Sequence, residues 1–357
     1  MSGATIDYIV VGQGLAGSAM AFQLLKRKKR ILVFDQPAQN NSSRIAAGLF
    51  NPITGKKLVR TWMADQLFPY LHTFYCEAEA ETKTRFFFPM PLYRPFLSVE
   101  EQNEWMAKSA DPRFEPYVEK VFLSTAFHSV QDDFGGLLLR QSGYLDTKIY
   151  INAIRNLILE KGIYIENHFD QNQLKISEAG VHYGQYTAGN IIFCEGSVRN
   201  KWFDWLPVRP LKGETIFVEA GITENVIFNR GVYAVPASQT GGGWRVGATY
   251  NFQDAMEGCT TEARAELELK LDNLLAVPFE SKGQEWGFRP TTPDRRPLLG
   301  RHPECDRILI FNGLGTKGVS LSPYFSEVLI HSIENGIALD KAVDIERYKS
   351  LYWSSPK

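Results

Sequence analysis

The sequence predicts an α/β fold with more than one domain, and three observations carry this prediction. The chain has 357 residues, which is more than one hydrophobic core usually serves. Short β-branched runs alternate with helix-like segments in the first part of the chain and again near its end. Between these parts lie stretches rich in aromatic residues, proline and glycine, where the alternation is lost. We therefore expect one domain with a parallel sheet and a second domain of different construction.

Composition and charge indicate an ordinary globular protein. Hydrophobic residues make up 44% of the chain and charged residues 22%, which excludes disordered and fibrous classes. Lys and Arg total 39 against 40 for Asp and Glu, so no whole-chain field favours nucleic acid or an anionic membrane. The four cysteines show neither disulfide-framework nor metal-ligand spacing. We expect a cytoplasmic protein without a metal site.

The first element is a buried strand at Ile6–Val11, followed directly by a glycine-rich turn and a helix. Each glycine of Gly12–Gly17 has a physical function there: Gly12 makes the tight turn, Gly14 admits a pyrophosphate, and Gly17 lets the helix pack on the strand. The helix N-terminus offers free N–H groups to phosphate. This pattern predicts a Rossmann-type dinucleotide site.

The second strand, Arg30–Phe34, ends at Asp35, 18 residues after Gly17. A carboxylate at this position accepts hydrogen bonds from a ribose diol and repels the 2′-phosphate of NADP. The motif leaves FAD and NAD equally open.

A membrane anchor is the alternative interpretation of Ile9–Leu25, which is mostly apolar and precedes the basic run Lys26–Arg30. Glycines interrupt this stretch, and a spanning helix needs about 20 apolar residues. We expect instead that the basic run is the solvated last turn of a helix, where cations complement the helix dipole.

The middle of the chain carries both kinds of pattern. Small residues and Arg44 in Ser42–Leu49 predict a loop bordering the ligand crevice. Residues 85–140 are aromatic and proline-rich, which suggests a different domain. Thr147–Glu160 is an amphipathic helix with Asp146 as its N-cap. A further buried strand is expected at Asn190–Cys194. Antiparallel strands are expected next, at Glu214–Glu219, Gly231–Pro236 and Trp244–Thr249, and then a helix at Glu262–Leu275.

Near the C-terminal end, Gly287–Gly300 is so rich in proline that we expect an irregular, stiff loop holding Arg289. A strand at Ile308–Phe311 then precedes a second glycine-rich turn and a helix through about Asn335. This arrangement presents a second positive helix end to the sheet edge.

In this order, the motifs resemble the superfamily of FAD-dependent D-amino-acid oxidases and glycine oxidases over nearly the whole chain. The landmarks that carry the resemblance are Gly12–Gly17, Ser43–Gly48, Gly143–Asp146, Cys194–Gly196, Arg209–Glu214, Tyr233–Thr249, Gly287–Gly300 and Gly313–Gly318.

The resemblance implies a Rossmann-type FAD-binding domain of residues 1–84, 141–205 and 284–357. An inserted α+β substrate domain, built on a mainly antiparallel sheet, would contain residues 85–140 and 206–283. FAD is expected to be noncovalent, because Gly287 stands where some members carry a cysteine. The residues expected to bind FAD are Gly12, Gly14, Leu15, Ala16, Gly17, Asp35, Ser43, Arg44, Ala47, Gly48, Glu195, Gly196, Gly313, Gly315, Thr316, Lys317 and Gly318.

Three residues are the catalytic candidates. Arg289 matches the substrate-binding arginine of the superfamily, and a guanidinium holds a carboxylate in a planar, paired contact. A salt bridge to Asp294 or a carbonyl clamp is its structural alternative. Tyr233 lies in a strand matched by an active-site tyrosine, although packing is the default for a buried tyrosine. Lys317 is a second cation for substrate or flavin, or a solvated lysine.

These features predict oxidation of the C–N bond of a small amino acid or N-substituted glycine. Hydride passes to flavin N5, the imine hydrolyses, and oxygen or another acceptor reoxidises the flavin. One alternative is a dehydrogenase subunit that passes electrons to a quinone or partner protein, and another is a FAD-binding protein that has lost catalysis.

A further alternative is an oxidase acting on carboxymethylaminomethyl uridine in tRNA. It arises because Gly315–Gly318 resembles the oxidase half of the bifunctional enzyme that matures that base. The near-zero net charge opposes RNA binding, whereas a basic face formed by Lys26–Arg30, or by Lys56, Lys57 and Arg60, would favour it.

Overall fold

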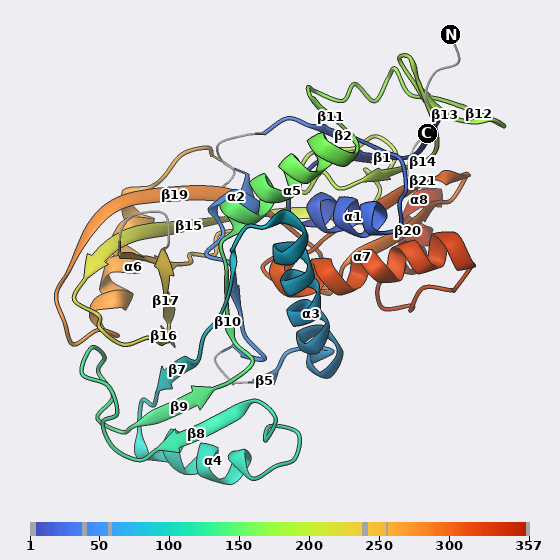
Figure 1. Ribbon diagram of the computed structural model, residues 1–357. Helices are drawn as coiled ribbons and strands as arrows, with labels where there is room; N and C mark the ends of the chain where they lie inside the picture. Colours follow the sequence, from blue (N-terminus) through green and yellow to red (C-terminus); the bar gives the residue numbers. More distant parts are fainter. Residues whose placement is uncertain (1–4, 38–40, 56–58, 238–241, 255, 355–357) are drawn as a thin grey trace.

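The computed structural model describes residues 5–37, 41–55, 59–237, 242–254 and 256–354. Two large sheets dominate it (Figure 1), and each is built from segments that are far apart in the sequence. This confirms the predicted α/β class with a second, mainly antiparallel sheet.

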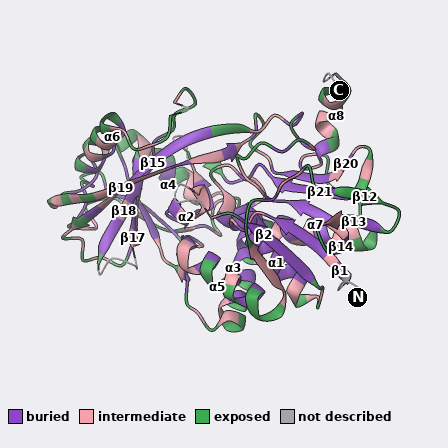
Figure 2. Cartoon of the chain, turned by 90° about the horizontal axis from the view of Figure 1, so that it is seen from above, coloured by how far each residue is buried: buried purple, intermediate pink, exposed green. Residues whose placement is uncertain are grey.

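The first sheet has a parallel centre made of the predicted buried strands. Its order is β11-β2-β1-β14-β13-β12, with β21 paired to β14 and β20 paired to β21. The strands are β1 (Thr5–Val11), β2 (Ile31–Asp35), β11 (Ile163–Glu166), β12 (Lys175–Ser177), β13 (Gly180–Tyr183), β14 (Tyr186–Phe193), β20 (Leu298–His302) and β21 (Cys305–Asn312). The pairs among β11, β2, β1, β14 and β21 are parallel, as a Rossmann-type sheet requires. β2 is fully buried, and β14 and β21 are buried toward their C-terminal ends, whereas the edge strand β11 is partly exposed (Figure 2).

Helices cover one face of this sheet. α1 packs between α5 and α7, and α3 packs on α7 (Figure 1). The helices are α1 (Leu15–Lys26), α3 (Ala64–Thr82), α5 (Thr147–Lys161) and α7 (Gly318–Asn335). The Asp146 carboxylate caps α5, as predicted, by accepting a hydrogen bond from Ile149 N.

Ile9–Leu25 divides into the end of β1, the glycine turn and α1. Among the residues that the structure describes, no helix is sufficiently long and apolar to cross a bilayer.

The second sheet is antiparallel except for one pair. Its order is β19-β15-β18-β17-β16-β7-β9-β8, and only β16 and β7 run parallel. The strands are β7 (Leu92–Pro95), β8 (Val118–Phe122), β9 (Gly136–Leu139), β15 (Arg209–Ala220), β16 (Ile227–Arg230), β17 (Val232–Ala237), β18 (Gly243–Gly247) and β19 (Phe279–Thr291). On one face, α6 (Thr261–Asp272) buries Leu267 and Leu271 against Ile216 and Phe228. The other face contributes Leu92, Leu139, Ile227 and Val235 to the core shared with α1 and α7.

The remaining elements are short. They are α2 (Ser42–Ile45), β3 (Leu49–Phe50), β4 (Ile53–Thr54), β5 (Val59–Arg60), β6 (Phe87–Pro89), α4 (Val99–Ser109), β10 (Gly143–Leu145), the 3-10 helix η2 (Ile345–Tyr348) and α8 (Lys349–Ser354). Ser42–Leu49, predicted as a loop, therefore starts with one helical turn. Asn41 caps that turn by accepting a hydrogen bond from Ser43 N.

The prediction of an irregular loop over Gly287–Gly300 is wrong for its two ends. Residues 287–291 complete β19, where Arg289 pairs with Leu211 and Pro290 with Pro210 of β15, and residues 298–300 begin β20. Proline is tolerated because β19 is an edge strand, whose outer N–H groups need no partner in the sheet. The expected domain boundary between residues 283 and 284 falls within β19, and the division into domains stays a prediction.

Candidate active site

A cavity of about 1400 Å³ runs between the two sheets. Its first end lies at the C-terminal edge of the parallel sheet, over the glycine turn between β1 and α1. Gly12 has φ of +91°, which a side chain would strain, and an added Cβ would lie 2.7 Å from Cys194 O. A Cβ on Gly17 would lie 1.8 Å from Gly12 O. The turn therefore needs glycine, and it leaves the α1 N-terminus open to the cavity.

Two side chains hold this turn in place. The hydroxyl of Ser43 accepts a hydrogen bond from Leu15 N at 3.1 Å. The Asp35 carboxylate accepts from Gln13 N at 2.9 Å and from the Tyr164 hydroxyl at 3.2 Å. Burial raises the pKa of Asp35, although these hydrogen bonds oppose the rise. Asp35 thus supports the turn as well as lining the cavity where a ribose is expected.

Glu195 and Gly196, directly after β14, form another wall. Gly196 has φ of +62°, and its carbonyl accepts a hydrogen bond from Asn312 Nδ2 at 2.8 Å, which joins this turn to the end of β21. Burial raises the pKa of Glu195 to about 7, while Asn200 Nδ2 donates to its carboxylate at 2.5 Å. A carboxyl group of variable charge therefore lies beside the nucleotide end of the cavity.

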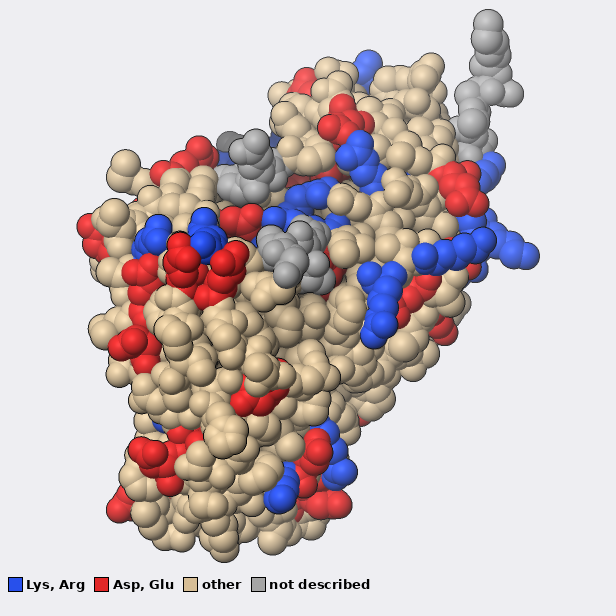
Figure 3. All heavy atoms as spheres, turned by 60° about the vertical axis from the view of Figure 1, so that its left-hand side comes forward, with Lys and Arg blue, Asp and Glu red and all other residues tan. Residues whose placement is uncertain are grey.

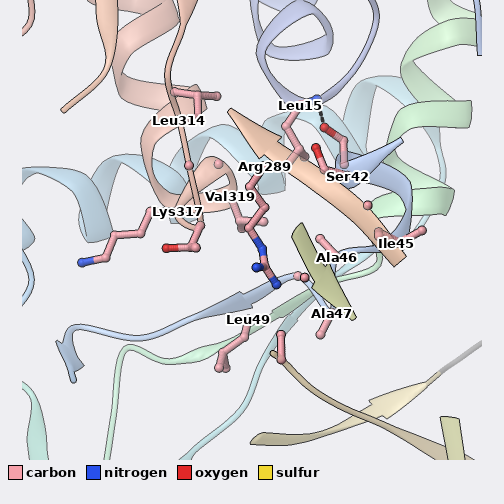
Figure 4. A pocket seen from close by; sticks show the side chains of 18 of the residues that line it. Leu15, Ser42, Ile45, Ala46, Ala47, Leu49, Arg289, Leu314, Lys317 and Val319 are labelled. Atoms are coloured by element: carbon pink, nitrogen blue, oxygen red, sulfur yellow. Dashed lines mark hydrogen bonds between the residues drawn. The ribbon is translucent and has the colours of Figure 1, made fainter. Parts of the chain in front are cut away.

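Farther along the cavity, its wall is formed by the antiparallel sheet, where Arg289 projects from β19. Nη1 of Arg289 donates to Thr249 O at 3.2 Å, and the guanidinium carbon lies 5.1 Å from the centroid of the Tyr250 ring. An added Cβ on Gly213 would lie 2.0 Å from Nη1, so the side chain needs glycine on the neighbouring strand. Figure 4 shows Arg289 reaching toward the segment of Ala46 and Ala47.

The Arg289 side chain thus binds a backbone carbonyl, which was one of its two structural alternatives. It does not form the other, a salt bridge to Asp294. That carboxylate instead binds Arg347 at 2.8 Å. The remaining donors of Arg289 face a cavity with room for a ligand.

Tyr233 of β17 also lines this part of the cavity. Its hydroxyl would lie 2.8 Å from a Cβ on Gly247, so a second strand glycine makes room for it. Burial raises the pKa of Tyr233 to about 12, while the nearby Arg289 charge opposes that rise. The phenol is therefore neutral at ordinary pH and can donate a hydrogen bond.

Lys317 occupies the N-cap position of α7, and its side chain has a different orientation from that of Arg289. Its side chain extends away from Arg289 (Figure 4), and Nζ lies 3.4 Å from Thr61 Oγ1. Burial, with Arg296 and Arg295 nearby, lowers the pKa of Lys317. Lys317 lines the cavity as a second, separate cation.

Nearly all residues predicted for the site line one cavity. The exceptions are Gly17 and Gly313, which support the turns, and Arg44, which lines a smaller neighbouring cavity and donates to Asn152 at 3.0 Å. The role of Gly213 and Gly247 in making room for side chains was not predicted, although a glycine inside a strand is a signal of such close approach. Thr61 and Arg94, for which no local motif exists, were not predicted either.

The cavity suits a dinucleotide together with a second ligand. A pocket for one small ligand usually has a volume of about 300–1000 Å³, so about 1400 Å³ accommodates more than one group. Glycines form the end of the cavity at the parallel sheet, and the Arg289 guanidinium lies farther along it. This fold and site define a dinucleotide-binding oxidoreductase with room beside the nucleotide site for a second ligand.

Comparison with known proteins identifies the cofactor. The family model described as FAD dependent oxidoreductase (DAO) matches residues 7–331, and the chain belongs to this family. FAD is therefore the cofactor, as the resemblance implied. Gly287 offers no thiol at the position expected for a covalent bond, in agreement with noncovalent binding.

The curated relatives include glycine oxidase of Bacillus subtilis, which is 23% identical over 92% of this chain and 93% of that protein. The bifunctional protein ThiO/ThiG of Synechocystis is 23% identical over 89% of this chain. The tRNA 5-methylaminomethyl-2-thiouridine biosynthesis bifunctional protein MnmC of Hydrogenovibrio crunogenus is 24% identical over 98% of this chain. The chain spans 50% and 59% of the lengths of these two bifunctional relatives.

Among solved structures, iminodiacetate oxidase from Chelativorans sp. BNC1 superposes with a TM-score of 0.77. The alignment covers 96% of this chain and 98% of that protein at 17% identity. At that identity the likeness shows the fold, which is that of DAO-family flavoenzymes.

Proposed function

We propose that this protein oxidises the C–N bond of a small amino acid or N-substituted glycine to an imine, which water then hydrolyses. The observation that carries this proposal is Arg289, a guanidinium held on a rigid strand and facing the cavity that begins at the FAD motif. The relatives named for glycine and iminodiacetate oxidation support it, because both compounds are amines with a carboxylate next to the reacting carbon.

We propose that the nucleotide end of the cavity holds FAD through Gly12–Ala16, Asp35, Ser43 and Gly196. When bound, FAD supplies the acceptor for two electrons. The substrate loses a hydride from carbon and a proton from nitrogen, which leaves the C=N bond of the imine. Water then adds to that bond and releases a carbonyl product and an amine.

The chain itself supplies position and charge. Arg289 binds the substrate carboxylate in a paired contact, which fixes the neighbouring C–H bond. The hydroxyl of Tyr233 donates a second hydrogen bond to this carboxylate. Lys317 and the α7 N-terminus line the cavity and would supply positive charge to bound FAD. A neutral amine needs no general base, so the proposal requires no catalytic histidine.

The surface charge of the protein fits a small amine substrate better than tRNA. The basic run Lys26–Arg30 begins only at the last residue of α1, and ion pairs neutralise much of it, in which Lys26 binds Glu77, Arg27 binds Glu327 and Lys29 binds Glu334. Lys56 and Lys57 lie outside the described residues. On the face shown in Figure 3, groups of basic side chains lie next to acidic ones.

The four cysteines are unpaired, which favours a cytoplasmic location.

The test is flavin bleaching under anaerobic conditions with glycine, sarcosine, D-alanine, D-proline and a carboxymethylaminomethyl nucleoside. We expect bleaching by at least one small carboxylate amine and a loss of about 100-fold or more in reduction efficiency in Arg289→Gln. Arg209→Gln, an exposed arginine on the paired strand, is the matched control and should behave like wild type.

Amines without a carboxylate should reduce wild type and Arg289→Gln equally. An unchanged response to carboxylate amines in Arg289→Gln would contradict the anchoring role, and no bleaching by any amine would contradict the proposed reaction. Peroxide yield compared with dye reduction then identifies oxygen or another acceptor.

A further inference from the structure

The cavity extends beyond Arg289 and Tyr233 to a polar end that glycine would not reach. This distal end is lined by Arg94, Glu101, Gln131, Asn229, Arg230, Lys270 and Asn273. It belongs to the β16, β7 and α4 side of the antiparallel sheet, whereas Arg289 comes from the opposite edge strand. A site for a compact amino acid does not require such an extension.

The strand register places Arg94 in line with the proposed substrate site. Tyr233 of β17 lies opposite Asn229 of β16, and the parallel pairing of β16 with β7 brings Asn229 beside Arg94. Leu92 and Ile227, two residues earlier on the same strands, belong to the core shared with α1. Because side chains two apart share a face, Arg94, Asn229 and Tyr233 form a row that faces the cavity.

Arg94 is poorly satisfied for a buried arginine. Its side chain is 13% exposed, and burial lowers its pKa. Its Nε is buried without a hydrogen-bond partner, and the ionic partner found in the described part of the chain is Glu101, with Nη2 and Oε1 3.5 Å apart. The other oxygen of Glu101 accepts from Leu97 N at 2.8 Å, at the start of α4. Because Nε is itself inaccessible from the cavity, a ligand there would bond the Nη groups, whose ionic contact within the described residues is the 3.5 Å pair with Glu101.

The neighbouring Arg230 differs from Arg94 in having its hydrogen bonds made within the fold. Its guanidinium donates to three backbone carbonyl groups, those of Phe96, Gln131 and Asn273. Arg230 is thus committed to joining loops of the fold, and it adds positive charge beside Arg94. Of these two arginines, Arg94 is therefore the one that has donors left for a ligand.

We propose that the distal end binds a carboxylate at the far end of the substrate, with Arg94 as its anchor. This inference rests on the proposed function and names its substrate class, an elongated secondary amine that carries an acid at both ends. The Arg289 guanidinium binds the carbonyl of Thr249, just after β18, and three strand spacings separate β18 from β7, which corresponds to about 14 Å between backbones. A monoanionic carboxylate suits the site better than a phosphate, because Glu101 would repel a dianion.

The test uses pairs of N-alkylglycines that differ only at the far end, one with a carboxylate and the other with a carboxamide, in a series of linker lengths. At the fitting length, we expect anaerobic flavin reduction by the carboxylate to be roughly 10- to 150-fold more efficient, the effect of one charge-assisted hydrogen bond. Arg94→Gln should abolish this preference, and Arg94→Lys should keep part of it. Sarcosine should react equally with all variants.

Arg140→Gln is the matched control, because Arg140 is an exposed arginine that follows β9 in the same sheet and bonds backbone carbonyls outside the cavity. Binding is measured separately with analogues in which sulfur replaces the amine nitrogen, so that oxidation cannot occur, and the flavin absorbance reports the Kd. The same preference for a terminal carboxylate, and its loss in Arg94→Gln, is expected in these titrations.

Absence of the preference in wild type, or its persistence in Arg94→Gln, overturns the distal anchor even when sarcosine or glycine bleaches the flavin. A stronger response to a terminal phosphate than to the carboxylate also overturns it. Failure of every amine, small or long, overturns the proposed function and this inference together.

Discussion

The two ends of the cavity are built in different ways. At the nucleotide end, a parallel sheet presents backbone N–H groups and glycines, and the side chains there mainly support the turns. At the amine end, an antiparallel sheet presents side chains, and glycines on neighbouring strands only make room for them. A site made of backbone depends on steric space, whereas a site made of side chains depends on charge and hydrogen bonds. Substitutions should therefore fail in different ways at the two ends.

The largest effect is expected for Gly17→Ala at the nucleotide end. Its Cβ would lie 1.8 Å from Gly12 O, so the turn must move or α1 must separate from β1. We expect a fall of about 1–3 kcal/mol or more in the free energy of unfolding, together with loss of bound FAD. Flavin content after gel filtration and urea unfolding measure both effects.

Gly221→Ala is the control for that experiment, because no atom lies within 4 Å of the added Cβ and Gly221 is exposed. Its flavin content and stability should match those of wild type. Full flavin content in Gly17→Ala would show that the turn tolerates a side chain, which would remove the distinction between the two ends.

The nucleotide end was predictable from the sequence because its determinants are local. The strand, three glycines, the helix and Asp35 occur within residues 6–35, and each constraint acts on neighbouring backbone. The helix dipole and the turn geometry follow from spacing alone. The structure adds what spacing could not show: the Ser43 hydroxyl, from the next segment, holds Leu15 N.

Glu195 is an exception to the comparison, since it places an ionisable side chain at the backbone-built end. Its pKa rises from the ordinary 4.5 to about 7, so the folded protein favours the protonated form. The resulting stabilisation is complete below pH 4.5 and is lost as pH rises to about 7, with an upper bound of roughly 3 kcal/mol. Glu195→Gln stays neutral, so it should be more stable than wild type at pH 8 and similar to it at pH 4.5.

Urea unfolding at these two pH values, with saturating FAD, tests this sign. Glu119→Gln, at an exposed position, should leave the pH dependence unchanged. Identical pH dependence in wild type and Glu195→Gln would mean that the carboxylate is charged in the folded state and stabilised by its neighbours.

The amine end could be predicted only in part, because its residues come together through strand pairing between distant segments. Arg289 was found through family resemblance, while its proline-rich surroundings predicted a loop where the edge strand β19 lies. Gly213 and Arg289 are 76 positions apart, and only the pairing of β15 with β19 shows that one makes room for the other. Arg94 had no sequence signal, since its row with Asn229 and Tyr233 exists only in the folded sheet.

The smallest effect is expected for Tyr233→Phe, which removes one hydroxyl at the amine end and keeps the ring. Because the pKa of Tyr233 is about 12, the phenol stays protonated across the assay range, and the change removes a neutral donor rather than a charge. We expect kcat/KM for carboxylate amines to fall by roughly two- to tenfold, with FAD content and stability unchanged. Tyr186→Phe, on β14 outside the cavity, should behave like wild type. Loss of FAD in Tyr233→Phe would show that this side chain belongs to the cofactor end. The side chains of the antiparallel sheet would then also bind the cofactor, which contradicts the division of the cavity into a backbone-built and a side-chain-built half.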